Sequence, residues 1–182
     1  MGLAQVTTVN VTSNVSSVSL TGINTDDVYM VSCNNVFFDS NDDMRIRWTV
    51  SGTNDSSSNY QYSHKAQYAD TGFGNTGTTG ANGLDINQGT GTSGNNSINL
   101  IMYLFNFNNA SGYSYCTYEN VHRNTSQSRT GVFNGSGVLQ ENQATDGVYF
   151  YLNSGNNFAS GTFTLYKVVG EWVKVINTDI AE

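Results

Sequence analysis

The sequence predicts an all-β protein, an antiparallel two-sheet sandwich that is jelly-roll-like and has roughly ten strands. Two observations support this fold class. Apolar and polar residues alternate with a period of two in many short segments, and stretches rich in Gly and Asn separate these segments. No window of comparable length has the i, i+3, i+4, i+7 spacing of an amphipathic helix. Many short strands with such turns favour a sandwich over a parallel α/β sheet.

Three segments alternate most strictly: MRIRWTV at 44–50, GVYFYL at 147–152 and GTFTLYKVV at 161–169. Each therefore offers one face to a core and one to a more polar surface. Further strands are predicted at 6–12, 15–20, 28–38, 59–68, 98–107, 113–121, 129–133 and 171–177.

The turns are expected to depend on Gly and Asn, because the chain has 19 Gly and no Pro. Asn82-Gly83 and Asn134-Gly135 are typical of type I′ hairpin turns, whose two central residues both take positive φ. Both dipeptides are therefore predicted to connect paired strands.

A chain of 182 residues suits one domain with a substantial core. Residues 1–24 are β-prone but nearly free of large side chains, which predicts an N-terminal arm or edge strand that needs a partner. The sandwich domain is assigned to 25–170, and 171–182 form an apolar C-terminal tail that is expected to dock. Residues 70–97 are interpreted as a long Gly/Thr/Asn loop, either functional or mobile.

The charge of the chain argues against nucleic acid as a partner. The net charge is −7, and the seven Lys and Arg residues are scattered along the chain, so no basic face for nucleic acid is expected.

No apolar run is long enough for membrane insertion. The first residues lack the pattern of a secretory signal, so we expect assembly in a cytoplasm, where Cys33 and Cys116 are buried, reduced thiols.

No catalytic residue and no cofactor are predicted. GFGNTG at 72–77 matches G-x-G-x-x-G, but no helix follows it to bind a phosphate, so nucleotide binding is excluded. The histidines, His64 and His122, are too few for a His-rich metal site, and the chain has no G-x-S-x-G nucleophile elbow. His64 lies in YQYSHKAQY at 60–68, whose even-numbered positions are interpreted as a packing surface.

One weak metal site is considered at the acidic segment DSNDD. Asp39, Asn41 and Asp43 have the alternate spacing of the first ligands of a calcium loop. Met44 and Val50 occupy the positions where an EF-hand needs Gly and a bidentate Glu, so an EF-hand is excluded. A looser Ca²⁺ site and a solvated acidic turn are the two alternatives.

The segment INLIMYLFNF at 98–107 is apolar on both faces, which suggests that both faces are covered. The domain core covers one face. A loop of the same chain or a neighbouring subunit covers the other, and the aromatic content favours a subunit. The candidate interface residues are Ile101, Tyr103, Phe105 and Phe107.

The segment SGNNFASGTFTLYKVV at 154–169 is interpreted as a structural turn followed by a core strand. Gly155 and Gly161 are predicted to shape the turn, and Asn156 and Asn157 to lie at an exposed tip that tolerates substitution. The core residues predicted here are Phe150, Phe163 and Leu165.

Two blocks carry a resemblance to a known group of proteins. GVYFYLNSGNNFASGTFTLYKV resembles the C-terminal hairpin of β-sandwich proteins of tailed-bacteriophage virions, of the tail-fibre or appendage type. DVYMVSCNNVFFDSNDDMRIRWTVSG is similar to a second recurring block of that group, and the two blocks frame residues 28–169. The chain departs from the group in having Lys167 where Gly usually follows Leu-Tyr.

The resemblance implies a non-enzymatic structural protein on the surface of a tailed-phage virion, either tail-associated or a head decoration. It implies self-association, with a homotrimer favoured, and contact with other virion proteins. A glycan-binding module that recognises host surface polysaccharide is the alternative, because eleven Tyr and two Trp on a β-scaffold suit sugar rings. A hydrolase acting on such polysaccharide is the third hypothesis.

Overall fold

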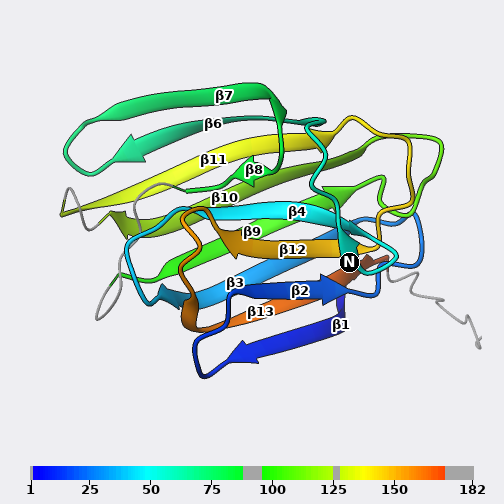
Figure 1. The fold of residues 1–182 in the computed structure, drawn as a ribbon, viewed down its shortest axis with the longest axis horizontal. Helices are drawn as coiled ribbons and strands as arrows, with labels where there is room; N and C mark the ends of the chain where they lie inside the picture. Colours follow the sequence, from blue (N-terminus) through cyan, green and yellow to red (C-terminus); the bar gives the residue numbers. More distant parts are fainter. Residues whose placement is uncertain (1, 88–95, 125–127, 171–182) are drawn as a thin grey trace, which may run out of the picture.

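The computed structural model describes residues 2–87, 96–124 and 128–170 (Figure 1). In these residues it has thirteen strands and no helix, and the strands form two antiparallel sheets, which confirms the predicted β-sandwich. No helix that would be long and apolar enough to cross a membrane is found there.

The large sheet has eight strands, and the residues of each follow from the alternation described above. In spatial order they are β1 (Gly2–Val11), β13 (Phe158–Val169), β3 (Tyr29–Phe38), β9 (Ile98–Phe105), β10 (Ser114–Asn124), β11 (Arg129–Leu139), β6 (Tyr60–Tyr68) and β7 (Phe73–Ala81).

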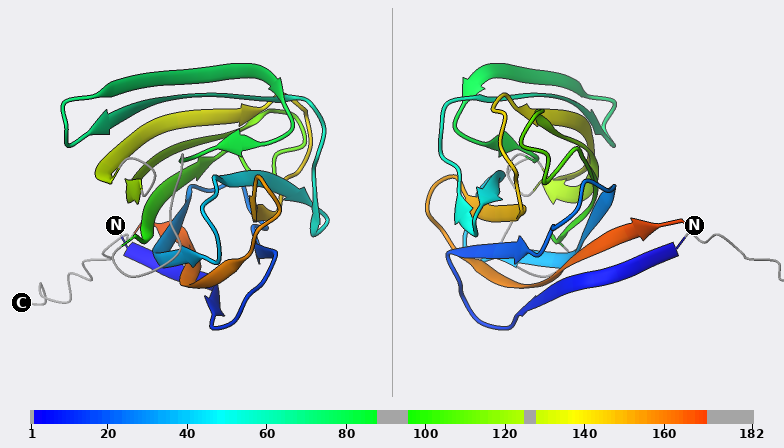
Figure 2. Two further views of the ribbon diagram at one scale, coloured as in Figure 1. Left: turned by 60° about the vertical axis from the view of Figure 1, so that its left-hand side comes forward. Right: turned by 90° about the vertical axis from the view of Figure 1, so that its right-hand side faces the viewer.

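The small sheet contains β2 (Ser17–Thr21), β12 (Gly147–Leu152), β4 (Met44–Val50) and β5 (Thr53–Asn54), with β8 (Leu84–Asp85) also paired to β4. The order β1-β13-β3-β9 facing β2-β12-β4-β8 is the strand order of a jelly roll. Figure 1 shows β2, β12 and β4 in front of β13, β3 and β9, while β10, β11, β6 and β7 extend the large sheet beyond them. Figure 2 shows the two layers from the side.

The core lies between the two layers. Trp48 of β4 is fully buried, packs against Phe107 at 5.0 Å between ring centroids, and donates its backbone N–H to the Tyr60 hydroxyl at 3.0 Å. Phe150 of the small sheet meets Phe163 of the large sheet at 5.2 Å. Inward residues at alternate positions of both sheets therefore form one continuous core.

The N-terminal segment supplies a strand to each sheet. β1 is the edge strand of the large sheet and pairs with β13, and β2 pairs with β12. Val11, Val18 and Leu20 are buried in the core. The predicted strand 171–177 and the apolar tail 171–182 lie outside the described residues.

The predicted loop at 70–97 is corrected in its first part, because residues 73–81 form β7, which pairs with β6. This strand is rich in Gly and Thr and has little apolar periodicity, since it is an edge strand with mostly exposed side chains. Residues 88–95 of that segment lie outside the described part of the chain.

Both hairpin predictions are wrong. Asn82-Gly83 connects β7 of the large sheet to β8 of the small sheet, and neither residue takes positive φ. Asn134-Gly135 lies in the middle of β11, which pairs with strands on both sides. Gly135 is required there because a Cβ would lie 2.5 Å from the Tyr118 ring and 2.7 Å from the Cβ of His64.

Candidate functional site

The acidic turn between β3 and β4 binds the turn between β12 and β13. Asp39 accepts hydrogen bonds from the backbone N–H of Asn157 at 2.9 Å and from its side-chain amide at 2.7 Å. Asp42 accepts bonds from the backbone N–H of Ser154 at 3.0 Å and from the Asn156 amide at 3.0 Å. The bonds from Asn157 lower the pKa of Asp39.

One expectation changes as a result. β12 and β13 lie in different sheets, so the segment between them is an arch that crosses the sandwich, and its Asn156 and Asn157 are half-buried partners of the acidic turn instead of an exposed tip. Asp39 of the weak calcium candidate is committed to Asn157. Asn41 and Asp43 also have interactions. Across the described ranges, no group of three His, Cys, Asp or Glu side chains is placed to hold a metal ion.

Two glycines, one in the arch and one in the first part of β13, lie at positive φ. Gly155 has φ of 80° and Gly161 has φ of 144°. The predicted core residues Phe150, Phe163 and Leu165 are all buried. The arch is therefore built from residues that determine backbone geometry and packing.

A buried polar cluster lies where β8 meets the large sheet. The Tyr118 hydroxyl donates to the backbone carbonyl of Asp85 at 2.9 Å, and His64 Nδ1 lies 3.1 Å from the same hydroxyl oxygen. Tyr62 donates to the Asp85 carboxylate at 2.6 Å, and Arg45 forms an ion pair with that carboxylate. These hydrogen bonds connect β8 of the small sheet to β6 and β10 of the large sheet.

Burial sets the protonation of the side chains in this cluster. Burial raises the pKa of the Tyr62 and Tyr118 hydroxyls and lowers the pKa of His64. All three side chains are therefore neutral near pH 7. The Tyr118 hydroxyl already donates to Asp85, so His64 Nδ1 donates to it, and the pair acts as a hydrogen-bonded support. Tyr60, His64 and Ala66 are buried, which confirms the packing surface predicted for 60–68.

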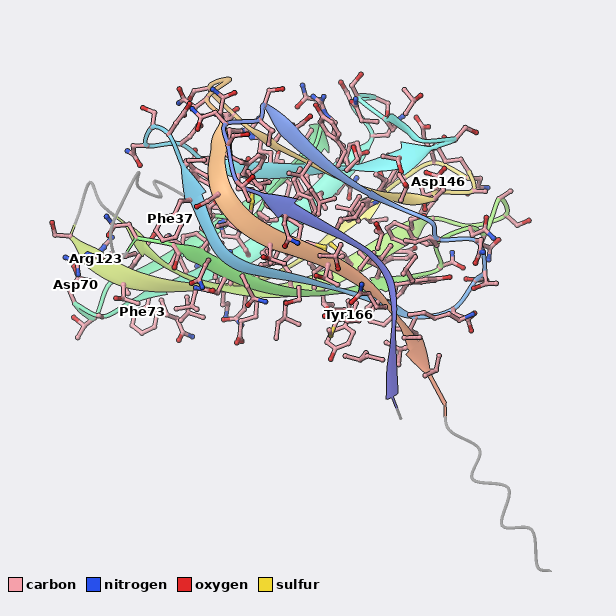
Figure 3. The ribbon with its side chains drawn as sticks, turned by 90° about the horizontal axis from the view of Figure 1, so that it is seen from below. Phe37, Asp70, Phe73, Arg123, Asp146 and Tyr166 are labelled. Atoms are coloured by element: carbon pink, nitrogen blue, oxygen red, sulfur yellow. The ribbon has the colours of Figure 1, made fainter. Side chains whose placement is uncertain are left out.

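The outer face of the large sheet, the side turned away from the small sheet, carries most of the exposed apolar side chains of the described residues. Figure 3 shows Phe73 and Tyr166 on this side, opposite the small sheet. The pairing register places the outward residues in rows across the strands, and one row runs Tyr166, Met30, Tyr103 and Thr117 on β13, β3, β9 and β10.

Three of the predicted interface residues lie on the outer face of β9. Ile101 is 51% exposed, Tyr103 is 42% exposed and Phe105 is 36% exposed. Phe107 is corrected, because it is fully buried against Trp48. β9 ends at Phe105, and Asn106 and Asn108 then take positive φ, so the chain leaves the strand and Phe107 turns inward.

Two further outward residues, Tyr115 and Val121 of β10, are 45% and 42% exposed and were not among the predicted interface residues. Their alternation with the inward residues was visible in the sequence. The inward positions of the same strand include Asn120 and His122, however, so polarity alone did not distinguish the core face from the solvent face.

A groove of about 840 Å³ crosses the outer face over β9, β10, β11, β6 and β7. Two neighbouring rows of outward residues bound it. The first row is apolar and aromatic at its β9 end and consists of Phe105, Tyr115, Val138, Gln61 and Thr79. The second row consists of Thr117, Ser136, Ser63 and Gly77, of which the first three carry hydroxyl groups. The lining residues between these rows, such as Cys116 and Gly137, present mainly backbone because their positions alternate to the inner side.

No protein-family model and no curated protein matches the chain. Among solved structures, a fructofuranosidase variant from Schwanniomyces occidentalis, complexed with fructosylnystose, aligns with a TM-score of 0.24 and 5% sequence identity. The alignment covers 91% of this chain and 34% of the fructofuranosidase chain, so this chain spans about a third of that protein's length. A likeness at this level carries no argument about function.

Proposed function

We propose that the chain is a non-enzymatic structural protein on the surface of a tailed-phage virion, tail-associated or head-decorating, and that it self-associates with a trimer favoured. The observation that carries the self-association is the exposed apolar surface of β9. Ile101, Tyr103 and Phe105 stand side by side on a strand whose other face is fully used by the core. Apolar and aromatic side chains in such a patch are typical of subunit interfaces.

The charges of the outer face suit a second copy of this chain. The whole chain carries −7, so two copies repel each other at most surfaces. The outward positions from β9 to β6 carry one carboxylate, Glu119 on β10, and two cations, Arg123 on β10 and Lys65 on β6. Copies that meet through this face therefore avoid the acidic loops.

The virion assignment is supported by the resemblance of the two sequence blocks. The structure places their turns against each other through Asp39 and Asn157, so both blocks belong to one unit of the sandwich. In the buried cluster, the Tyr118 hydroxyl and His64 Nδ1 are hydrogen-bonded inside the fold, which supports a packing role for these side chains.

The test has two parts. Light scattering of the purified chain at micromolar concentration is expected to give a multiple of 19.7 kDa, preferably three times that mass. Peptides of the chain are expected in mass spectra of purified particles of the phage that encodes it, and a specific antibody is expected to label those particles in electron micrographs. A monomer, or particles that lack the chain, would overturn the corresponding half of the proposal.

A further inference from the structure

We infer that the groove on the outer face of the large sheet is a binding site for an uncharged polysaccharide chain. The groove is open along its length and crosses five strands, so it suits an extended chain of several sugar units. Its volume of about 840 Å³ lies in the range of sites that hold small molecules.

The two rows that bound the groove offer the two kinds of contact that a sugar ring uses. Tyr115 presents an exposed aromatic ring outside the β9 patch, and its flat apolar face suits stacking on the C–H face of a pyranose. Thr117, Ser136 and Ser63, in the neighbouring row, offer hydroxyl groups, which both donate and accept hydrogen bonds and so match sugar hydroxyls.

The absence of charge in the lining indicates an uncharged ligand. None of the thirteen residues that line the groove is Asp, Glu, Lys or Arg. An acidic polysaccharide would lack a cationic partner inside the groove while approaching a protein of net charge −7. The nearest charged residues, Glu119 and Lys65, stand one row further along the strands.

The groove extends beyond the β9 patch proposed for self-association. Its hydroxyl-bearing residues Ser136 and Ser63 lie on β11 and β6, two and three strands away from β9. The hydroxyl groups of the groove can stay in contact with water, whereas the apolar side chains of Ile101 and Tyr103 gain stability when a second subunit buries them. The site therefore goes beyond the proposed function, and only its biological use, contact with a host cell surface, rests on that function.

The test uses the full chain on a printed array of purified bacterial surface polysaccharides, both neutral and acidic. We expect binding to neutral polysaccharides only. Tyr115→Ala is expected to weaken that binding about tenfold by removing a stacking ring. Ser136→Phe is expected to abolish it by filling the groove. Tyr113→Ala is the matched control, since Tyr113 is an exposed tyrosine that does not line the groove, and it is expected to bind like the original chain.

Thermal unfolding and light scattering are measured on each variant, so that a folding defect or a change in oligomeric state is separated from lost binding. Failure to bind any neutral polysaccharide would overturn the inference, and so would undiminished binding by folded Tyr115→Ala and Ser136→Phe. Binding confined to acidic polysaccharides would overturn it as well. A monomer that binds neutral polysaccharide through the groove would refute the self-association and leave the inference standing.

Discussion

Gly161 of β13 lies so close to Val36 of β3 that a Cβ on the glycine would be 2.9 Å from both the Cα and the Cγ2 of the valine. Gly161 also has φ of 144°, a conformation that side chains disfavour. The pairing register of the two strands shifts at this point, so the glycine allows β13 to bend from the arch into the sheet.

Gly161→Val is expected to destabilise the protein by about 1–3 kcal/mol or more, because backbone strain and a steric clash act together. Gly155→Ala is the comparison, since Gly155 also has positive φ but has no atom within 4 Å of the position of a Cβ. Urea unfolding of both variants measures the difference. Equal losses in the two would show that the contact with Val36 contributes nothing.

Phe163→Ala is expected to cost about 3–5 kcal/mol, because it opens a cavity in the core. Phe163 is fully buried and contacts the rings of Phe150 and Phe158 at 5.2 and 5.4 Å. Phe73→Ala is the matched control, because Phe73 is 81% exposed, and a change within about 0.5 kcal/mol is expected. Urea unfolding measures the loss of stability in each variant. A loss in Phe73→Ala as large as that in Phe163→Ala would contradict this assignment of the core.

The sequence predicted best the strands whose apolar periodicity comes from the core. β4, β12 and the inward residues of β9 follow their predicted alternation, because each has one face in the sandwich interior. β7 was missed because an exposed edge strand of Gly and Thr has no such face. Gly135 was assigned to a turn because sequence alone does not separate a glycine needed for positive φ from one needed to make room for Tyr118.

The exposed residues of β9 were predicted from the sequence, whereas the groove was not. The exposed residues Ile101, Tyr103 and Phe105 follow from a strand that is apolar on both faces. The groove depends on which residues of five strands stand opposite one another, and that register is a long-range property of the fold. The apposition of Asp39 and Asn157, 118 positions apart, is equally invisible to local patterns.

Acid is expected to destabilise the protein through the carboxylates that bind neighbouring segments. The hydrogen bonds from Asn157 lower the pKa of Asp39, and those from Lys167 and Arg129 lower the pKa of Asp27 and Asp70. A carboxyl whose pKa is lower in the folded state stabilises that state above its unfolded pKa of about 4, and the contribution is lost as the pH falls through the folded pKa. The melting temperature, measured from neutral pH down to about pH 3, is therefore expected to decrease once the pH is below about 4.

Asn157→Ala is expected to reduce this acid sensitivity, because it removes one of the two hydrogen bonds from Asn157 to Asp39. The variant is also expected to melt at a lower temperature than the original chain at neutral pH, with a smaller difference at about pH 3. Asn142→Ala, at an exposed asparagine, is the control and is expected to behave like the original chain. An Asn157→Ala deficit that stays constant across this pH range would contradict the role of Asp39.

Both cysteines are expected to be unreactive in the folded protein. Cys33 and Cys116 are buried free thiols, and burial raises the pKa of Cys33 and raises that of Cys116 to about 12. The reactive thiolate is therefore scarce at pH 8 and shielded from reagents. A disulfide reagent such as DTNB is expected to label neither thiol of the native chain and both thiols in guanidinium chloride. Prompt labelling of the native chain would contradict this.

The double variant Ile101→Ser, Tyr103→Ser is expected to convert the self-associated protein into a monomer of about 19.7 kDa. Both residues project from the outer face of β9, so their replacement leaves the core intact while removing the apolar patch. If association stabilises the fold, the melting temperature of the original chain rises with protein concentration, whereas that of the variant does not. Phe73→Ser is the control, because Phe73 is an exposed apolar residue on β7, four strands from β9, and it is expected to leave the mass unchanged. Light scattering over a range of concentrations measures the mass, and a double variant that keeps the mass of the original chain would place the subunit interface elsewhere.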